Sequence, residues 1–245
     1  MAGAGAGRNH DRRRRDDDVT RAVFFDVDFT LIYPGPTFQA EGYRRACAAR
    51  GIVVDPARFD AATAASSFIL DEVEEQIYRH DLFVHYTASI IEHMGGRGEQ
   101  VIDVAREIYD QWSINHHFEL YDDVAPALTS LSRRGLIVGA ISNSHRSLDA
   151  FCEHFSLHDV ITVSVSSAEH GYMKPHRSIF DSALAQAGVA AGDAVMVGDS
   201  LKHDIDGARA AGLRAVLLRR SGEVPPGLPP DLPVITTLAE LDAHL

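Results

Sequence analysis

The chain alternates between two patterns of apolar residues. Short runs of consecutive apolar residues, typical of strands buried on both faces of a sheet, alternate with segments whose apolar residues recur every three or four positions, as in helices. This alternation predicts the α/β class, with a doubly wound parallel sheet and helices on both of its faces. The runs that predict strands are residues 22–27, 136–142, 160–165, 194–197, 214–218 and 234–235.

Helices are expected between these strands. Asp123 and Ser144 are the expected N-caps of the first two, because short polar side chains there can accept hydrogen bonds from free backbone N–H groups. Gly135, Gly188 and Gly212 each follow the last apolar residue of a helical pattern, where glycine commonly ends a helix. Each predicted strand is therefore followed by a helix and a glycine stop or a Pro-rich connector.

Residues 34–118 follow helical spacing only, and they contain no strand pattern. They predict one helix that stops at Gly51, a long helix over residues 69–91 with a candidate break near Asp81, and a third helix over residues 101–112. The block therefore reads as a helical insertion in an α/β core. The expected organisation is a tail (1–20), a core domain (21–33 and 119–245) and an inserted helical domain (34–118).

Composition narrows the class of protein. The chain has 245 residues, a formal net charge of −12 and 45% apolar residues, which suits a soluble core with one inserted module. The acidic excess argues against nucleic acid as a partner, because phosphate backbones would be repelled. No apolar run is long enough to span a membrane, so we expect no membrane contact and a cytoplasmic location. We also expect a monomer or a homodimer.

The N-terminal residues and the cysteines add little chemistry. Residues 1–20 are rich in Gly, Ala, Arg and Asp and could not bury an apolar surface, so a disordered tail is expected. No apolar segment follows the arginines at 12–15, which argues against an export signal. Cys47 and Cys152 lie within helical patterns, where a thiol behaves as a small apolar side chain, and no disulfide framework is implied.

Polar side chains gather where the predicted strands end. Asp26 and Asp28 interrupt the first strand, Ser142 and Asn143 end the second, and Asp199 follows the fourth. Ligands of parallel sheets bind beyond the carboxyl ends of the strands, so one site is expected there. Two residues apart on an extended backbone, Asp26 and Asp28 point the same way, and at about 4 Å and an effective dielectric near 20 they repel by about 4 kcal/mol.

That repulsion calls for a cation, a proton or a cluster of backbone N–H groups beside the two aspartates. A divalent metal that prefers oxygen ligands is the natural candidate. The alternative is that both aspartates only cap the turn that follows the strand, where Asp is common. The pattern of the two residues alone leaves this alternative open.

With these residues in place, the sequence resembles the haloacid dehalogenase superfamily, a large group of phosphohydrolases with an aspartate nucleophile. Four ordered motifs carry the resemblance over residues 21 to about 218, and a helical cap occupies the place of residues 34–118 in many relatives. The motifs are Asp26-Val27-Asp28-Phe29-Thr30, then Ser142, then Lys174, and then Gly198-Asp199-Ser200 with Asp204.

The resemblance implies a role for each motif. Asp26 is expected to be the nucleophile that becomes an aspartyl-phosphate, and Asp28 the general acid and then the base. Mg²⁺ is the expected cofactor, with Asp26, Asp199 and the Asp28 backbone carbonyl as its ligands. The remaining implied residues bind phosphate or support the site, and they are Ser142, Lys174 and Asn143 for phosphate, and Thr30, Ser200 and Asp204 for support.

Substrate choice is expected to depend on the insertion. The candidates are Phe29, which stands where the family usually has glycine, Phe38, Trp112 and Arg146. Arg146 could bind a second anion of a small phosphorylated metabolite, although an arginine in a first helical turn is more often solvated. The pairs His80 with His85 and His116 with His117 lack the spacing of a transition-metal site, so other roles are favoured for them. Whether these four side chains can contact a substrate depends on where the insertion lies relative to the site.

The expected activity is Mg²⁺-dependent hydrolysis of small phosphomonoesters. Asp28 argues against a hydrolytic dehalogenase, because a halide needs no proton when it leaves. Two alternatives stay open: a phosphomutase, which would use the same two aspartates but exclude water, and a non-catalytic interaction protein that keeps a phosphate on Asp26. Released phosphate would separate the hydrolase from both.

Overall fold

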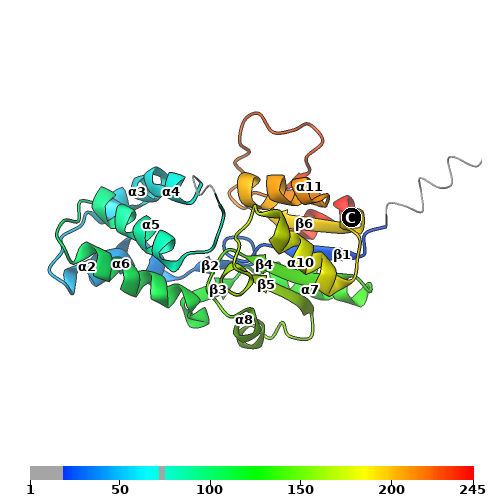
Figure 1. Cartoon of the computed structure of the whole chain (residues 1–245), viewed down its shortest axis with the longest axis horizontal. Coiled ribbons are helices and arrows are strands. Elements are labelled where there is room, and N and C mark those ends of the chain that lie inside the picture. Colours follow the sequence, from blue (N-terminus) through cyan, green and yellow to red (C-terminus); the bar gives the residue numbers. More distant parts are fainter. Residues whose placement is uncertain (1–18, 72–74) are drawn as a thin grey trace, which may run out of the picture.

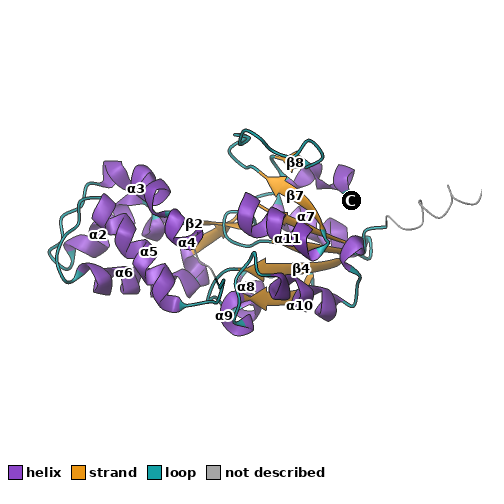
Figure 2. Ribbon diagram, turned by 45° about the horizontal axis from the view of Figure 1, so that its top comes forward, coloured by secondary structure: helices purple, strands orange, loops and turns teal. Residues whose placement is uncertain are grey.

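A six-stranded parallel sheet forms the centre of the molecule. The computed structural model describes residues 19–71 and 75–245, so nearly all of the predicted tail lies outside the described residues. The strand order is β5-β4-β1-β6-β7-β8 (Figures 1 and 2), and the fold class predicted from the sequence is confirmed. The strands are β1 (Ala22–Phe25), β4 (Ile137–Ser142), β5 (Ile161–Ser166), β6 (Ala194–Gly198), β7 (Arg214–Leu218) and β8 (Val234–Ile235).

Strand β1 is central because all four of its side chains are apolar and fully buried. It pairs with β4 on one side and with β6 on the other, so that Phe25 lies beside both Ala140 and Val197. Val23 and Phe25 point into one hydrophobic cluster, and Ala22 and Phe24 point into a second cluster on the other face. This alternation is the two-residue period of a strand.

Helices cover both faces of the sheet (Figure 2). Helices α7 (Val124–Arg133) and α8 (Leu148–His154) contribute Leu128 and Phe151 to the cluster that contains Val23. On the opposite face, α10 (Arg177–Ala187) and α11 (Gly207–Ala211) contribute Phe180 and Ala208 to the cluster that contains Phe24. Shorter turns complete the core, namely α9 (Ser167–His170), η5 (Ala191–Asp193), the π-helical turn η6 (Leu201–Asp206) and η7 (Leu238–His244).

A second group of helices lies beyond the carboxyl ends of the strands (Figure 1). An antiparallel pair, β2 (Ile32–Pro34) with β3 (Phe118–Leu120), joins this helical unit to the core. Its helices are α2 (Ala40–Ala48), α3 (Phe59–Ser66), α4 (Phe68–Asp71), α5 (His80–His93) and α6 (Val101–Asp110), with short turns η1 (Pro36–Phe38), η2 (Pro56–Arg58), η3 (Gln111–Ser113) and η4 (Asn115–His117). In the two described stretches of chain, no helix is both long enough and apolar enough to cross a bilayer.

The helix predicted over residues 69–91 is not continuous, and the candidate break near Asp81 corresponds to the start of α5 at His80. Helix α4 ends at Asp71 and α5 begins only at His80. Between them, Ile77 forms an antiparallel bridge with Tyr172 of the core, with Tyr78 N donating to Gly171 O at 2.9 Å. Tertiary pairing therefore overrides the helical spacing of the apolar residues there. Helix α3 and the pair β2 with β3 were not predicted either, because short Ala-rich or three-residue elements have no distinct period.

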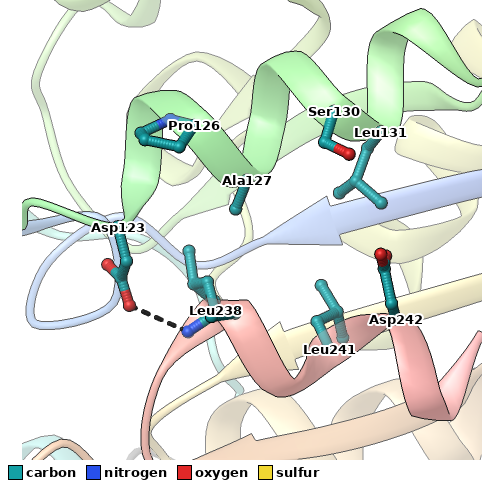
Figure 3. A pocket seen from close by; sticks show the side chains of 9 residues that line it. Asp123, Pro126, Ala127, Ser130, Leu131, Leu238, Leu241 and Asp242 are labelled. Carbon is teal, nitrogen blue, oxygen red and sulfur yellow. Dashed lines mark hydrogen bonds between the residues drawn. The ribbon is translucent and has the colours of Figure 1, made fainter.

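Two predicted N-caps act elsewhere. The hydroxyl that accepts a hydrogen bond at the start of α8 belongs to Ser147, three residues after Ser144. Asp123 precedes α7, but its carboxylate faces the C-terminal turn η7 and accepts a hydrogen bond from Leu238 N at 2.8 Å (Figure 3). Arg220 donates two hydrogen bonds to the same carboxylate. Asp123 therefore links the C-terminal turn η7 to Arg220, which lies just after β7, instead of capping α7.

Candidate active site

Lys174 lies at the centre of the site and is almost completely buried, with 2% of its surface exposed. Its ammonium group donates three hydrogen bonds, to Asp26 Oδ1 at 2.6 Å, to Asp204 Oδ1 at 2.7 Å and to Ile141 O at 2.8 Å. Although burial alone would lower it, Asp204 and Asp26 raise the pKa of Lys174 above its usual range. The lysine is therefore charged, and it brings together three motifs that are far apart in the sequence.

Asp26 follows directly from the central strand. Its backbone N donates to Val197 O at 2.9 Å, which extends the pairing of β1 with β6 by one residue and fixes the direction of the side chain. Burial raises the pKa of Asp26 well above its usual value, Lys174 opposes the shift, and Asp204 and Asp199 add to it. The carboxylate thus lies among like charges with a single lysine to balance them.

Asp204 is held in place by two groups and by a glycine. Its Oδ1 accepts from Lys174, and its Oδ2 accepts from the backbone N of Ser200 at 3.0 Å. A Cβ atom on Gly198 would come within 2.3 Å of Asp204 Oδ2, so only glycine leaves room for the carboxylate against the end of β6. The π-helical turn η6 that presents Asp204 starts at Ser200, whose hydroxyl accepts from His203 N at 3.2 Å.

Two polar residues lie at the end of β4, and one of them, Asn143, supports the lysine. The side chain of Asn143 pairs with the backbone of Lys174 in both directions, accepting from its N at 2.6 Å and donating to its O at 2.9 Å. Ser142 is fully buried, and its Oγ lies 2.9 Å from Ser144 Oγ. A serine hydroxyl donates one hydrogen bond and accepts others, so Ser142 can accept from Ser144 and still donate elsewhere.

Three carboxylates could hold a metal ion. Asp26, Asp199 and Asp204 each place one oxygen within 4.8 Å of the others, and hard oxygen donors of this kind suit Mg²⁺. Because both oxygens of Asp204 already accept hydrogen bonds, Asp26 and Asp199 are the better ligands. Burial, and then Asp204, raise the pKa of Asp199 to about 7. A cation at this position would offset that repulsion.

Asp28 faces a different partner from the other acids. Arg146 is fully buried and donates from Nη1 to Asp28 Oδ1 at 2.9 Å and from Nη2 to Trp112 O at 2.8 Å. The guanidinium also stacks over Phe118, 4.3 Å from the ring centroid. Arg146 therefore links the core, the end of the helical unit and Asp28, and it is buried instead of solvated.

The loop after Asp28 turns through a left-handed residue. Phe29 has a φ of 64°, a conformation that glycine adopts without strain, which explains why glycine is usual at this position. The side chain of Phe29 is 45% exposed, and its ring lies 6.4 Å from that of Trp112. Thr30, also of this loop, is fully buried, and its backbone O accepts from Arg220 Nη2 at 2.7 Å.

A cavity of about 570 Å³ opens beside Asp28 and extends into the helical unit. Phe29, Phe38 and Trp112 line it, as proposed from the sequence, and Arg146 is not among its lining residues. Sequence reasoning missed His203 and the pair Phe83 and Tyr86, whose three-residue spacing on one helix does place them on one face.

Comparison with known proteins identifies the family. The family model of haloacid dehalogenase-like hydrolases matches residues 20–212. The chain belongs to this family. The resemblance predicted from the four motifs is confirmed, and so is the expectation that the chain is a hydrolase of this family.

Individual relatives resemble the chain along most of its length. The N-acylneuraminate-9-phosphatase of Mus musculus is 31% identical over 221 residues, which cover 84% of this chain and 85% of that protein. A HAD phosphatase from Thermococcus onnurineus is 24% identical, with a TM-score of 0.65 over 91% of this chain and 97% of that one. A 2-haloacid dehalogenase from Pseudomonas syringae is 26% identical, with a TM-score of 0.62 over 92% and 97%.

Proposed function

We propose that the protein is a Mg²⁺-dependent phosphatase that hydrolyses small phosphomonoesters through an aspartyl-phosphate on Asp26. In the first step a carboxylate oxygen of Asp26 attacks phosphorus, and the bond from phosphorus to the ester oxygen breaks. Asp28 gives its proton to the leaving alkoxide. Arg146 holds Oδ1 of Asp28, so Oδ2 is the atom that we assign to this transfer.

The second step returns the enzyme to its starting state. Asp28, now a carboxylate, takes a proton from water as the water oxygen attacks phosphorus. The bond from phosphorus to Asp26 breaks, phosphate leaves, and the carboxylate of Asp26 is restored. As charge moves onto the phosphoryl oxygens, Ser142 and Lys174 bind them, and Lys174 gives up one of its three hydrogen bonds to do so. A Mg²⁺ ion bound by Asp26 and Asp199 would reduce the repulsion between carboxylate and phosphate.

One observation supports this proposal above the others. The carboxylate of Asp26, from the first motif, and the ammonium of Lys174, from the third, meet at 2.6 Å beside Asp199 and Asp204. Asp28 lines the adjoining cavity, which puts an acid where a leaving oxygen would lie. A halide needs no such acid, so Asp28 favours a phosphatase over a dehalogenase. Phosphatase is also the activity named for the relative from Mus musculus.

The deciding experiment measures released phosphate. The full chain is incubated with a panel of phosphomonoesters, once with millimolar Mg²⁺ and once with a chelator, and Asp26→Asn serves as the control. We expect phosphate from at least one ester with Mg²⁺, and none from the variant. Isomerised product without free phosphate would favour a phosphomutase, and neither product would overturn the proposal of catalysis.

We also propose that the helical unit α2 to α6 is the cap of this enzyme. The backbone bridge between residues 76–78 and 171–173 fastens it to the loop that ends in Lys174, with Met173 N donating to Gln76 O at 2.7 Å. A second contact joins the unit to η6, where Lys202 donates to the backbone O of Asp71. Closure at both places would exclude water from the site during the first step.

A further inference from the structure

The cavity beside Asp28 has an unusually apolar wall for a site that binds an anion. Three aromatic side chains, Phe38, Phe83 and Trp112, face it from separate elements of the helical unit. Further aromatic and aliphatic side chains complete the wall, among them Phe29, Tyr86, Ile108 and Met173. Gln39, Thr63 and Thr87 add uncharged polar groups, but most of the lining side chains are apolar and would desolvate a ligand.

The wall of the cavity, as far as the structure describes it, contains no lysine or arginine side chain. Among the described residues that line the cavity, the ionisable side chains other than tyrosine are Asp28, Asp60 and His203, and none is lysine or arginine. Arg146, which holds Asp28 and Trp112 O, is fully buried and does not line the cavity. A second phosphate or a carboxylate on the substrate would thus enter an apolar space without a partner, which is costly.

We propose that the substrate is a phosphomonoester with one anionic group and an uncharged, largely apolar body, aromatic or branched aliphatic. The inference rests on the proposed phosphatase function and names the substrate class of that site. The phosphoryl group lies at the end lined by Asp28 and Asn143, and the body lies against α5 and α6, where Tyr86 and Ile108 line the cavity. A volume of about 570 Å³ is within the usual range for a small-molecule site.

The test compares primary alkyl phosphates, so that the leaving group is equally reactive in each. The probes are 2-(naphthyl)ethyl phosphate, glucose 6-phosphate and fructose 1,6-bisphosphate, each assayed with Mg²⁺ for released phosphate. We expect kcat/KM for the naphthylethyl ester to exceed that for either sugar by ten- to a hundredfold, mostly through a lower KM, because apolar contact discriminates by about this factor. Equal or higher values for a sugar would overturn the substrate class and leave the phosphatase function standing.

A charge placed in the wall gives an independent test. In Tyr86→Lys the new ammonium lies in the cavity, and we expect the ratio of kcat/KM for the naphthylethyl ester to that for the bisphosphate to fall at least tenfold. Val53→Lys is the matched control, since Val53 is in the helical unit, is 85% exposed and does not line the cavity. An equal change in both variants, or none in Tyr86→Lys, would overturn the inference.

Binding is measured separately from turnover. The parent protein is melted with 2-(naphthyl)ethylphosphonate and with a sugar phosphonate, neither of which can be hydrolysed. We expect a larger rise in Tm with the naphthyl compound, because a ligand stabilises only through its affinity for the folded site. If no ester in the panel released phosphate, the proposed function would fail, and this result would still decide whether the cavity accepts an apolar body.

Discussion

At the scale of single residues, the two aspartates of the first motif differ in their cationic partner. Asp26 is bound by a lysine that also serves Asp204, and Asp28 is bound by Arg146, which serves the backbone of Trp112. In the mechanism that we propose, the lysine contacts a phosphoryl group, whereas the arginine fixes the position of one carboxylate oxygen. This division supports separate roles for the two acids, nucleophile and general acid.

We predict that Asp28→Asn lowers turnover by about 10² to 10⁴, because an amide cannot protonate the leaving oxygen or activate water. Aryl phosphates need less help from an acid, so their first step should slow less than that of alkyl phosphates. The measurement is single-turnover kinetics with one ester of each type. Equal losses for the two esters would exclude Asp28 as the general acid.

The pKa of Asp199 predicts how stability depends on pH. In the metal-free protein it is about 7, against an ordinary value of 3.8, so between these values the folded state keeps a proton that the unfolded state has lost. The free energy of unfolding therefore falls as pH rises through this window, by on the order of 1–3 kcal/mol. Asp199→Asn should remove this loss.

Melting curves at pH 5 and pH 8, in chelator and in millimolar Mg²⁺, test this. In chelator, the Tm of Asp199→Asn minus the Tm of the parent should be several degrees larger at pH 8 than at pH 5. Mg²⁺ should raise the Tm of the parent more than that of the variant, since one anionic ligand has gone. A difference between variant and parent that does not change with pH would contradict the assignment.

At the scale of elements, the site depends on how closely η6 approaches the end of β6. We predict that Gly198→Ala destabilises the protein by about 1–3 kcal/mol, because the new Cβ would overlap Asp204, which Lys174 and Ser200 hold in place. Turnover should also fall, since Asp204 orients Lys174. Urea unfolding and phosphate release measure the two effects.

Gly192→Ala is the matched control for this substitution. Gly192 lies in η5, the turn just before β6, and an added Cβ there would meet nothing within 4 Å. We expect its stability to stay within about 0.5 kcal/mol of the parent and its turnover to be unchanged. Equal effects of the two substitutions would mean that the close contact with Asp204 is not what requires glycine at Gly198.

Elements with a strong period were predictable from the sequence, and elements set by distant partners were not. All six strands of the sheet lie within two residues of their predicted bounds, because buried parallel strands need uninterrupted apolar runs. The segment between α4 and α5 was predicted as helix, because nothing local in Ile77 reveals its bridge to Tyr172. Local periodicity does not encode such a pairing across 95 positions.

The contacts within the candidate site could also be predicted only in part from the sequence. The motifs predicted that Asp26, Lys174 and Asp204 belong together, and the structure brings their side chains into contact. The direction of Arg146 could not be predicted, because an arginine in a polar segment after a strand is compatible with solvent, substrate or a buried ion pair. Its partner Asp28 is 118 positions away, and only the fold brings the two together.

At the scale of the whole molecule, the bridge between Ile77 and Tyr172 holds the helical unit against the core. Directly opposed residues of an antiparallel pair have Cα separations suited to a disulfide. We predict that the double variant Ile77→Cys with Tyr172→Cys loses at least tenfold in kcat/KM when oxidised, because substrate must enter as the unit opens. A reductant should restore activity, as measured by released phosphate.

Each single cysteine variant is a control for this pair. The two native thiols, Cys47 and Cys152, are buried and free, so they do not compete for the new disulfide. Neither single variant should respond to oxidant. Full activity of the oxidised double variant would mean that substrate reaches Asp26 without any movement of the helical unit.

The burial of Lys174 has a practical consequence for labelling. The sequence contains only one other lysine, Lys202, which is exposed and donates to the backbone O of Asp71 in the helical unit. An amine-reactive fluorophore needs an accessible neutral amine, which Lys174, with three hydrogen bonds and 2% exposure, does not offer. Apart from the α-amino group, the dye therefore attaches at Lys202 alone, beside the contact between helical unit and core, where its emission can follow opening in real time.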